Sequence, residues 1–473
     1  MRHSGKSAPP GLQVAKMTPQ KNSGSSRKGE HMPESILPKQ GFLTRPYVTV
    51  CILSLLYAFS FLDRNLPSLL LRDIKHDLSL SDTEVSLLTG TAFAIVYVLA
   101  SFPLSRLADR GSRRSVIAIG VFIWGVMTAL CGAASSFLLF FVARMGVGLG
   151  EAAITPASHS LIATLFPAGQ RGRPMAIFNL GAILGMGSAM LVGAGAVALI
   201  EVGKSAFPQF FLAAVPTWRL VMMSIGLLTL LLVLLAVRIA DPASASRADP
   251  TADQSLRKVL GVMWKERGAY APLVLAIPFT NLGIFGFNTW VPSLFIRTHG
   301  WGESETGLKV GMASVIGGLV GALFSSLVSD RLASRSAAAP LNIVLCSITA
   351  CTIIAWLIVL TNNPNIQLLL IGTLHVAVFP MGVLGVVALQ GITHPSIRAQ
   401  ASAIFVMVAV LVGVGAGPTV VAVFTDFIIQ DEQHVHWSMA YTWLLVMLVS
   451  GPIILFNRSA YVRAVLAAGD QEV

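Results

Sequence analysis

Residues 61–70 read "FLDRNLPSLL", and this stretch decides the fold because it places Asp63 and Arg64 inside an apolar run. From Tyr47 to Leu71 these two are the only charged residues in 25 positions. A run of that length suits a membrane-spanning helix, and a charge at bilayer depth costs about 2.5–3.5 kcal/mol on insertion scales. We therefore expect the pair to have partners that offset this cost, and to mark a functional site.

The rest of the chain has the same character. Of its 473 residues 54% are hydrophobic and 12% are charged, against about 25% charged in a typical soluble domain. This composition indicates an all-α polytopic membrane protein. Twelve segments are long enough to span a bilayer: 47–70, 86–106, 115–134, 137–162, 174–200, 218–239, 271–296, 308–329, 340–360, 366–391, 400–424 and 438–457.

The net charge of +11 orients the protein and does not indicate a nucleic-acid partner. Of 33 Lys and Arg, 25 fall at the end shared by both termini, five fall at the opposite end and three lie in or at spans. This asymmetry is the positive-inside pattern, so we expect a multi-pass protein of the plasma (inner) membrane with both termini in the cytoplasm.

The chain divides into two halves that resemble each other. "LADRGSRR" (107–114) follows the second span and "VSDRLASR" (328–335) follows the eighth; "RGRPMAIF" (171–178) and "RAQASAIF" (398–405) follow the fourth and tenth. Duplicated six-span halves are typical of secondary transporters, whose binding site lies between them. The expected parts are a disordered basic tail (1–45), two six-helix halves (46–239 and 269–460), a cytoplasmic linker (240–268) and a C-terminal tail (461–473).

Two further charges lie within the fourth span. Arg144 and Glu151 are seven residues apart, nearly two helical turns, so they share a helix face. With Asp63 and Arg64 they make two acids and two bases within one half, and such a group can be neutral overall. One interpretation is a static ion-pair cluster between spans one and four.

The functional interpretation of these four charges is proton coupling. Burial and a movable Arg shift the proton affinity of a carboxylate in opposite directions. Glu151 is the first choice for the titrating acid, because "GLGEAA" lets another helix approach it closely, and Asp63 is the second. Arg64 and Arg144 pair with these acids or bind an anionic substrate head group, since the Arg fork fits phosphate and carboxylate.

Several motifs resemble one transporter family. "PLSRLADRGSRR" (103–114) resembles the loop signature of the major facilitator superfamily. "FLDR" (61–64), "ARMGVGLGEAAITPASHSLIATLFP" (143–167) and "GVGAGP" (413–418) resemble its spinster-like lipid transporters and their bacterial relatives, and anion:cation symporters share the Asp-Arg and Gly-x-Gly-Glu elements. The resemblance implies two six-helix halves with alternating access, and proton-coupling roles for the matching acids. It also implies a gating role at one end of the halves for Asp109, Arg110, Arg113, Asp330 and Arg331.

The substrate class follows from the distribution of charge. From Ser336 to Ile397 there is no Asp, Glu, Lys or Arg in 62 residues, and spans seven and eleven lack internal charge. A cavity with one charged and one apolar wall suits an amphiphile. Residues that line such a cavity or only pack between helices are Asn65, Tyr97, His159, Asn179, Asn281, Phe285, Asn288, Trp290 and His375.

The sequence therefore predicts a proton-coupled transporter of an amphipathic, lipid-like anion or zwitterion, acting as a monomer. The alternatives are a proton-coupled symporter of small organic anions, such as carboxylates or sugar acids, and a membrane scaffold without flux. A scaffold would keep its function when Glu151 and Asp63 are neutralised together. No metal-ligand cluster or nucleophile–base pair stands out, so we expect no metal, no cofactor and no enzymatic activity.

Overall fold

The computed structural model describes residues 46–242, 256–333, 336–394 and 397–469. Within them twelve helical segments are long and apolar enough to cross a membrane, which confirms the all-helical polytopic fold. The expected N-terminal tail, residues 243–255 of the expected linker and the last four residues lie outside the described residues. The segments are Pro46–Ser68, Asp82–Ala108, Arg113–Ala133, Phe137–Leu165, Gly172–Ala206, Thr217–Ala236, Arg267–Thr298, Glu303–Ser325, Ala339–Leu360, Pro364–Ile392, Gln400–Ile429 and Glu432–Ala468.

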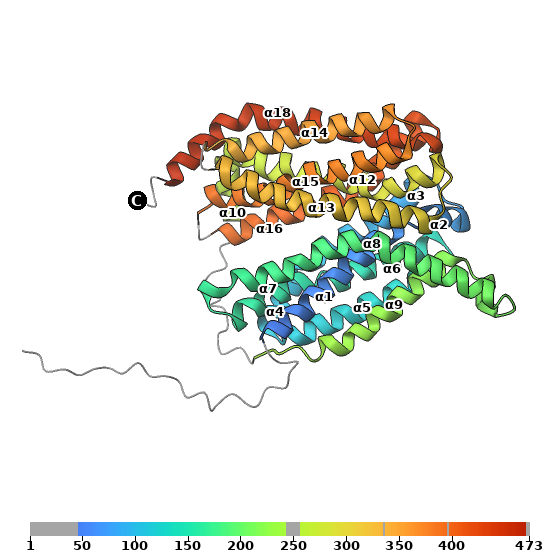
Figure 1. Ribbon diagram of the computed structural model, residues 1–473. Coiled ribbons are helices and arrows are strands. Elements are labelled where there is room, and N and C mark those ends of the chain that lie inside the picture. Colours follow the sequence, from blue (N-terminus) through green and yellow to red (C-terminus); the bar gives the residue numbers. More distant parts are fainter. Residues whose placement is uncertain (1–45, 243–255, 334–335, 395–396, 470–473) are drawn as a thin grey trace, which may run out of the picture. The chain divides into compact units, whose positions relative to one another are not determined.

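The spans form two groups of six, coloured blue to green and yellow to red in Figure 1. The first group contains α1 (Pro46–Asn65), α3 (Asp82–Ser86) with α4 (Ala92–Arg110), α5 (Arg113–Ala133), α6 (Phe137–Glu151) with α7 (Ile154–Leu165), α8 (Gly172–Ala206) and α9 (Thr217–Ala236). The second contains α11 (Arg267–Ala271) with α12 (Ile277–Thr298), α13 (Glu303–Ala333), α14 (Ala339–Leu360), α15 (Pro364–Ile392), α16 (Arg398–Ala409) with α17 (Gly417–Val423), and α18 (Val435–Gly469).

The bundle has two ends. We call the end where α1 begins and α18 finishes the terminal end, and the opposite end the far end (Figure 1). The short amphipathic helix α2 (Leu71–Leu78) lies at the far end, between α1 and α3. Helix α10 (Leu256–Lys265) leads into α11 at the terminal end.

The fourth span is broken next to its acidic residue. Helix α6 ends at Glu151 and α7 begins at Ile154. Pro156 accounts for the break, because its ring clashes with the carbonyl of Ala152, four residues earlier, and it has no N–H to donate to that carbonyl. The break sets Glu151 at the end of a helix, directly before the two-residue turn formed by Ala152 and Ala153.

The internal repeat is also visible in equivalent hydrogen bonds of the two halves. Arg171 donates from Nε to the carbonyl of Phe166 over 3.0 Å, and Arg398 donates from Nε to the carbonyl of Thr393 over 3.2 Å. In both halves the arginine therefore reaches back five residues, to the end of the preceding span. This equivalence agrees with the expected duplication of a six-helix unit.

Small residues allow the spans to pack closely. A Cβ at Gly181 of α8 would lie 2.2 Å from the Ser54 carbonyl oxygen of α1, and one at Gly185 would lie equally close to that of Ala58. Helix α8 also runs beside α13 of the other half, where a Cβ at Gly187 would meet Val315 at 2.7 Å (Figure 1). Close approach of this kind is how membrane helices gain packing contacts without a hydrophobic driving force.

Candidate functional site

The four charges expected in the first half lie together and pair crosswise between α1 and α6. Arg64 Nη2 is 2.6 Å from Glu151 Oε2, and Arg144 Nη1 is 3.7 Å from Asp63 Oδ2. Asp63 and Arg144 are fully buried, Glu151 is 1% exposed and Arg64 is 9% exposed. We call these four side chains the buried cluster. Two opposite-charge pairs make it neutral, which is the condition for tolerating ions at this depth.

Polar neighbours satisfy part of the hydrogen-bonding capacity of the buried cluster. Ser60 donates to Glu151 Oε2 over 2.7 Å, and Thr128 donates to Asp63 Oδ2 over 3.0 Å. Arg144 donates to the carbonyls of Leu88 and Thr89 over 3.3 and 3.5 Å. The second oxygen of each acid, Asp63 Oδ1 and Glu151 Oε1, accepts no hydrogen bond from the described residues. Each acid therefore keeps an oxygen on which a proton can reside.

Glycines bring the neighbouring helices close to the buried cluster. A Cβ at Gly148 would lie 2.5 Å from the Phe93 carbonyl oxygen of α4, and one at Gly150 would lie 2.5 Å from the Gly120 carbonyl oxygen of α5. The expected close approach around Glu151 is thus present, since α4 and α5 contact α6 on either side of this acid. The packing excludes water and strengthens the charge interactions.

Aromatic rings surround the Arg64 guanidinium. Its carbon lies 4.4 Å from the ring centroid of Phe93, 4.8 Å from that of Phe61 and 5.2 Å from that of Tyr97. These are cation–π distances, so the rings stabilise the positive charge alongside Glu151. Further aromatic contacts connect Phe61 to Tyr57, Tyr57 to Phe178 and Phe178 to His159, whose ring centroids are 4.5–5.3 Å apart.

A small cavity lies beside the buried cluster, where the two halves meet. Its volume is about 10 Å³, close to that of a single water. The first half contributes polar residues and the second half mainly apolar ones. The lining residues are Arg64, Asn65, Ser68 and Thr89 from the first half, and Phe285, Thr289, Val414 and Pro418 from the second. Arg64 is the one member of the buried cluster among these lining residues.

The other residues proposed for a cavity lie in varied surroundings. Asn281 donates to the Pro278 carbonyl, and His375 shares a hydrogen bond with the Ile371 carbonyl of its own helix. Trp290 is fully buried, and its indole N–H donates to the Pro418 carbonyl over 2.9 Å, which ties α12 to α17. Tyr97 and Asn288 are half-buried, and His159 and Asn179 are exposed.

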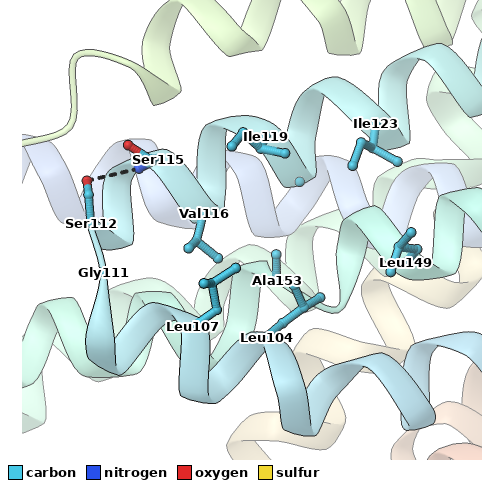
Figure 2. A pocket seen from close by; sticks show the side chains of 11 residues that line it. Leu104, Leu107, Gly111, Ser112, Ser115, Val116, Ile119, Ile123, Leu149 and Ala153 are labelled. Carbon is cyan, nitrogen blue, oxygen red and sulfur yellow. Dashed lines mark hydrogen bonds between the residues drawn. The ribbon is translucent and has the colours of Figure 1, made fainter.

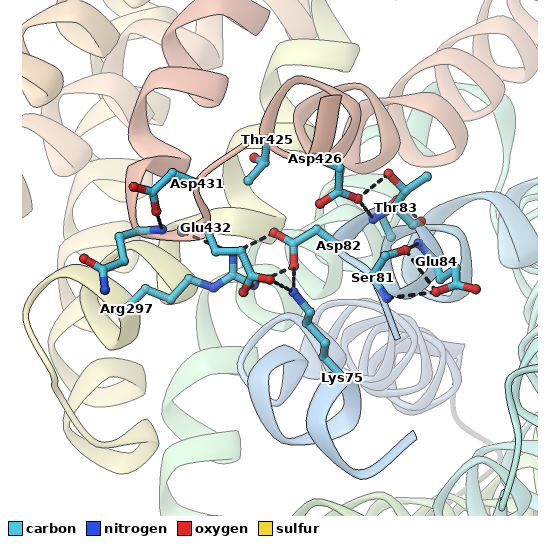
Figure 3. Close-up of polar contacts among 12 residues, drawn as sticks. Lys75, Ser81, Asp82, Thr83, Glu84, Arg297, Thr425, Asp426, Asp431 and Glu432 are labelled. Carbon is cyan, nitrogen blue, oxygen red and sulfur yellow. Dashed lines mark hydrogen bonds and ion pairs between the residues drawn. The ribbon is translucent and has the colours of Figure 1, made fainter. Parts of the chain in front are cut away.

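A second group of charges joins the two halves at the far end (Figure 3). Asp82 of α3 accepts two hydrogen bonds from Arg297 of α12, over 2.6 and 2.8 Å, and one from Lys75 of α2 over 2.7 Å. Lys75 also pairs with Glu432, which precedes α18. We call Lys75, Asp82, Arg297 and Glu432 the far-end network. It fixes the halves together at this end in the conformation described.

Asp426 adds a further contact at the same end. It accepts hydrogen bonds from the backbone N–H and the hydroxyl of Thr83, over 2.7 and 2.6 Å (Figure 3). The sequence predicts spans seven and eleven to be free of internal charge. The helical segments extend to Thr298 and Ile429, however, and so include Arg297 and Asp426. The second half is therefore apolar around the cavity but charged at the far end.

The residues proposed for gating lie at the terminal end. Arg113 is buried; its Nε donates to Ser160 over 2.9 Å, and its Nη1 lies 3.8 Å from Asp241. These contacts involve the first half and the start of the expected linker, and Arg110 is exposed. The side chains of Asp109, Asp330 and Arg331 lie outside what the structure describes, so the gating role stays a prediction.

Comparisons with known proteins agree with this architecture. A family model described as Major Facilitator Superfamily matches residues 53–418. The chain is 31% identical over 396 residues to an MFS-type efflux pump of Mycolicibacterium smegmatis, covering 82% of this chain and 86% of that protein. It is 31% identical over 155 residues to a probable L-galactonate transporter of Escherichia coli, covering 33% of this chain and 34% of that one. Protein spinster homolog 1 of Xenopus laevis is 32% identical over 151 residues, 32% of this chain and 28% of that one.

Among solved structures, the fold is similar to that of a bacterial homolog of the human lysosomal transporter spinster, in an inward-facing and unoccupied conformation. The TM-score is 0.74 at 21% identity, over 90% of this chain and 99% of the other. At this identity the likeness concerns the fold. These relatives and this neighbour are transporters or efflux pumps, and none is described as an enzyme.

Proposed function

Because the chain belongs to the major facilitator superfamily of transporters, we propose that it is a proton-coupled secondary transporter of an amphipathic, lipid-like anion or zwitterion. The observation that carries the proposal is the double position of Arg64. Its guanidinium bonds Glu151 at 2.6 Å and also lines the cavity between the halves. One side chain thus contacts both the acid proposed to titrate and the space where a substrate would bind.

Coupling follows from competition for Arg64. An anionic head group in the cavity draws the guanidinium away from Glu151, and a buried carboxylate without its partner is costly unless it takes up a proton. Release of the anion returns Arg64 to Glu151, and the proton leaves. Asp63 and Arg144 form the second acid–base pair by which the proton is taken up or passed on.

The walls of the cavity support an amphipathic substrate. Arg64, Asn65, Ser68 and Thr89 present polar groups from one half, and the other half presents mainly Phe285, Val414 and Pro418. The cavity is water-sized in this conformation; when the halves separate, a head group would face the first wall and a hydrocarbon tail the second. Transport proceeds by alternating access, in which the far-end network opens while contacts form at the terminal end.

The membrane orientation and the domain organisation of the chain are part of the same proposal. The excess of Lys and Arg at the terminal end supports a cytoplasmic location for that end and for both termini, with the protein in the plasma (inner) membrane. The chain functions as a monomer, with halves 46–239 and 269–460 joined by a cytoplasmic linker. Asp109 and Asp330, with their neighbouring arginines, are proposed to hold the halves at the terminal end when the far end opens.

A second candidate is a proton-coupled symporter of small organic anions. The similarity to a probable L-galactonate transporter favours it, because it includes a sugar-acid carrier among the relatives. The Arg64 fork binds a carboxylate as readily as a phosphate. This candidate uses the same buried cluster, so the two differ in the substrate and not in the coupling.

The proposal is tested with the purified protein in liposomes that contain a pH-sensitive dye. Lysophospholipids, sphingoid phosphates and small organic acids are added in turn under an imposed proton gradient. We expect a pH change with the amphiphiles in the wild type. Glu151→Gln should abolish gradient-driven accumulation but keep exchange of labelled substrate, whereas the matched control Glu305→Gln, an exposed acid in α13, should behave as wild type.

Two outcomes would change the proposal. Gradient-driven accumulation by Glu151→Gln at the wild-type rate would refute the coupling role of this acid. A response to organic acids alone would assign the second candidate. Arg64→Lys sharpens the substrate assignment, because the Lys point charge cannot form a two-oxygen contact; we expect about tenfold weaker apparent affinity, the equivalent of about 1.4 kcal/mol.

A further inference from the structure

A hollow of about 380 Å³ lies between α4, α5 and the junction of α6 with α7, near the terminal end (Figure 2). Figure 2 shows hydrocarbon side chains along its length and two hydroxyls, Ser112 and Ser115, at one end. Ile119, Leu107 and Leu149 are 59%, 55% and 39% exposed, so the hollow opens on the outer surface of the first half. In a membrane, that surface faces lipid.

The inner wall of the hollow lies against the broken fourth span. Gly120 and Ala153 line it, and a Cβ at Gly120 would lie 2.7 Å from the Gly150 carbonyl oxygen and 2.8 Å from the Ala153 Cβ. Ala153 belongs to the turn between α6 and α7, two residues after Glu151. The hollow therefore reaches the segment that positions this acid.

Basic side chains flank the polar end of the hollow. Arg110 and Arg114 are exposed, and each is adjacent in sequence to a lining residue, Gly111 and Ser115. The nearby acid, Asp241, accepts hydrogen bonds from the Ser112 hydroxyl and the Arg114 backbone N–H, and its charge is offset by Arg113 at 3.8 Å. The exposed guanidinium groups leave this end with a net positive charge.

We propose that the hollow is a binding site for one anionic phospholipid of the leaflet at the terminal end. One acyl chain occupies the apolar groove, and the phosphate lies near Arg114, Arg110 and the two serine hydroxyls. Lipid tails are as apolar as the groove, so burial alone gives no preference; the anionic head group supplies it. The site is independent of the transported substrate and does not rest on the proposed function.

The test measures retained lipid by native mass spectrometry of the full-length protein. The detergent-purified wild type is incubated with palmitoyl-oleoyl phosphatidylglycerol or with the phosphatidylcholine of the same chains. We expect one phosphatidylglycerol to stay bound under activation that removes phosphatidylcholine. Equal retention of the two lipids would overturn the proposal, because the head group would then play no part.

Two variants locate the lipid. Ile119→Trp fills the groove and should lose the retained phosphatidylglycerol, whereas Leu227→Trp, on α9 and 62% exposed, should keep it as the matched control. Arg114→Gln should weaken retention by about fivefold, as expected for one basic side chain near an anionic head group. Retention by Ile119→Trp equal to that of wild type would place the lipid elsewhere and refute the site. Unchanged thermal unfolding of both Trp variants shows that they are folded.

Discussion

The buried cluster and the far-end network use the same residue types in different surroundings. Asp63, Arg64, Arg144 and Glu151 all belong to one half, and none is more than 9% exposed. In the far-end network, by contrast, Lys75 and Asp82 belong to one half and Arg297 and Glu432 to the other. Its exposure is uneven, since the side chain of Asp82 is fully buried and that of Glu432 is 57% exposed.

The difference indicates what each group can do. Rigid-body motion of the halves leaves the pairs inside one half intact, so the buried cluster can change its protonation without an accompanying rearrangement of helices. Pairs that cross the boundary must break whenever the far end opens. The first group is therefore suited to protons and substrate, and the second to setting the equilibrium between conformations.

The largest expected effect is a loss of stability in Arg144→Leu. This change leaves Asp63 buried without its partner, and breaking a buried pair on one side costs about 3–5 kcal/mol in the free energy of unfolding. Thermal unfolding of the detergent-purified protein should show a large drop in melting temperature. Much of the loss should return in Asp63→Asn/Arg144→Leu, because the second change removes the unpaired charge. Arg458→Leu, which replaces an exposed arginine of α18, serves as the control and should change little.

An intermediate effect is expected for Asp82→Asn, on conformation and not on unfolding. The amide keeps the shape but loses the charge that holds Arg297 and Lys75, and hydrogen bonds to charged groups are worth about 1.5–3 kcal/mol. The far-end-open population should rise by about tenfold or more. Spin labels at Gln209 and Glu305, in a background without the four native cysteines, would report this as longer distances in pulsed electron paramagnetic resonance.

The control for this prediction is a nearby acid that does not cross the boundary. Asp431 bonds His434 within the second half, over 2.8 Å, so Asp431→Asn should leave the label distances unchanged. Asp82→Glu, which keeps the charge, should stay close to wild type. A far-end-closed distribution in Asp82→Asn identical to wild type would show that the network does not set the equilibrium.

The same contrast explains how far the sequence predicts the site. Asp63, Arg64, Arg144 and Glu151 were recognisable because each interrupts an apolar run, and the spacing of the last two places them on one face. The crosswise pairing was not predictable, since it depends on how α1 and α6 lie against each other. Asp82 and Arg297 were missed because an acid at the start of a helix and a base at its end are ordinary features of helix ends.

The smallest predicted effect tests whether pH acts on the far end. Asp73 of α2 and Glu303 of α13 are two acids that interact across the boundary of the halves. Burial raises the pKa of Asp73 above its ordinary value, and the Arg72 charge opposes this in part. The two carboxylates repel while both are charged, and the repulsion is relieved when the pair takes up one proton that the two side chains share. The pair takes up this first proton above neutral pH.

The sign follows directly: as pH falls from alkaline to neutral, the pair takes up its shared proton, the contact strengthens and the far-end-closed population should increase. Because Asp73 is half-buried, the change should be less than about fivefold. The same spin labels, measured from alkaline to neutral pH, provide the readout. In Asp73→Asn the amide stays neutral, so the closed population should already be high at alkaline pH and change little as pH falls to neutral. Asp77→Asn is the control, because Asp77 pairs with Arg219 inside the first half. A pH response that survives in Asp73→Asn but is lost in Asp82→Asn would move the pH sensitivity from this carboxyl pair to the far-end network.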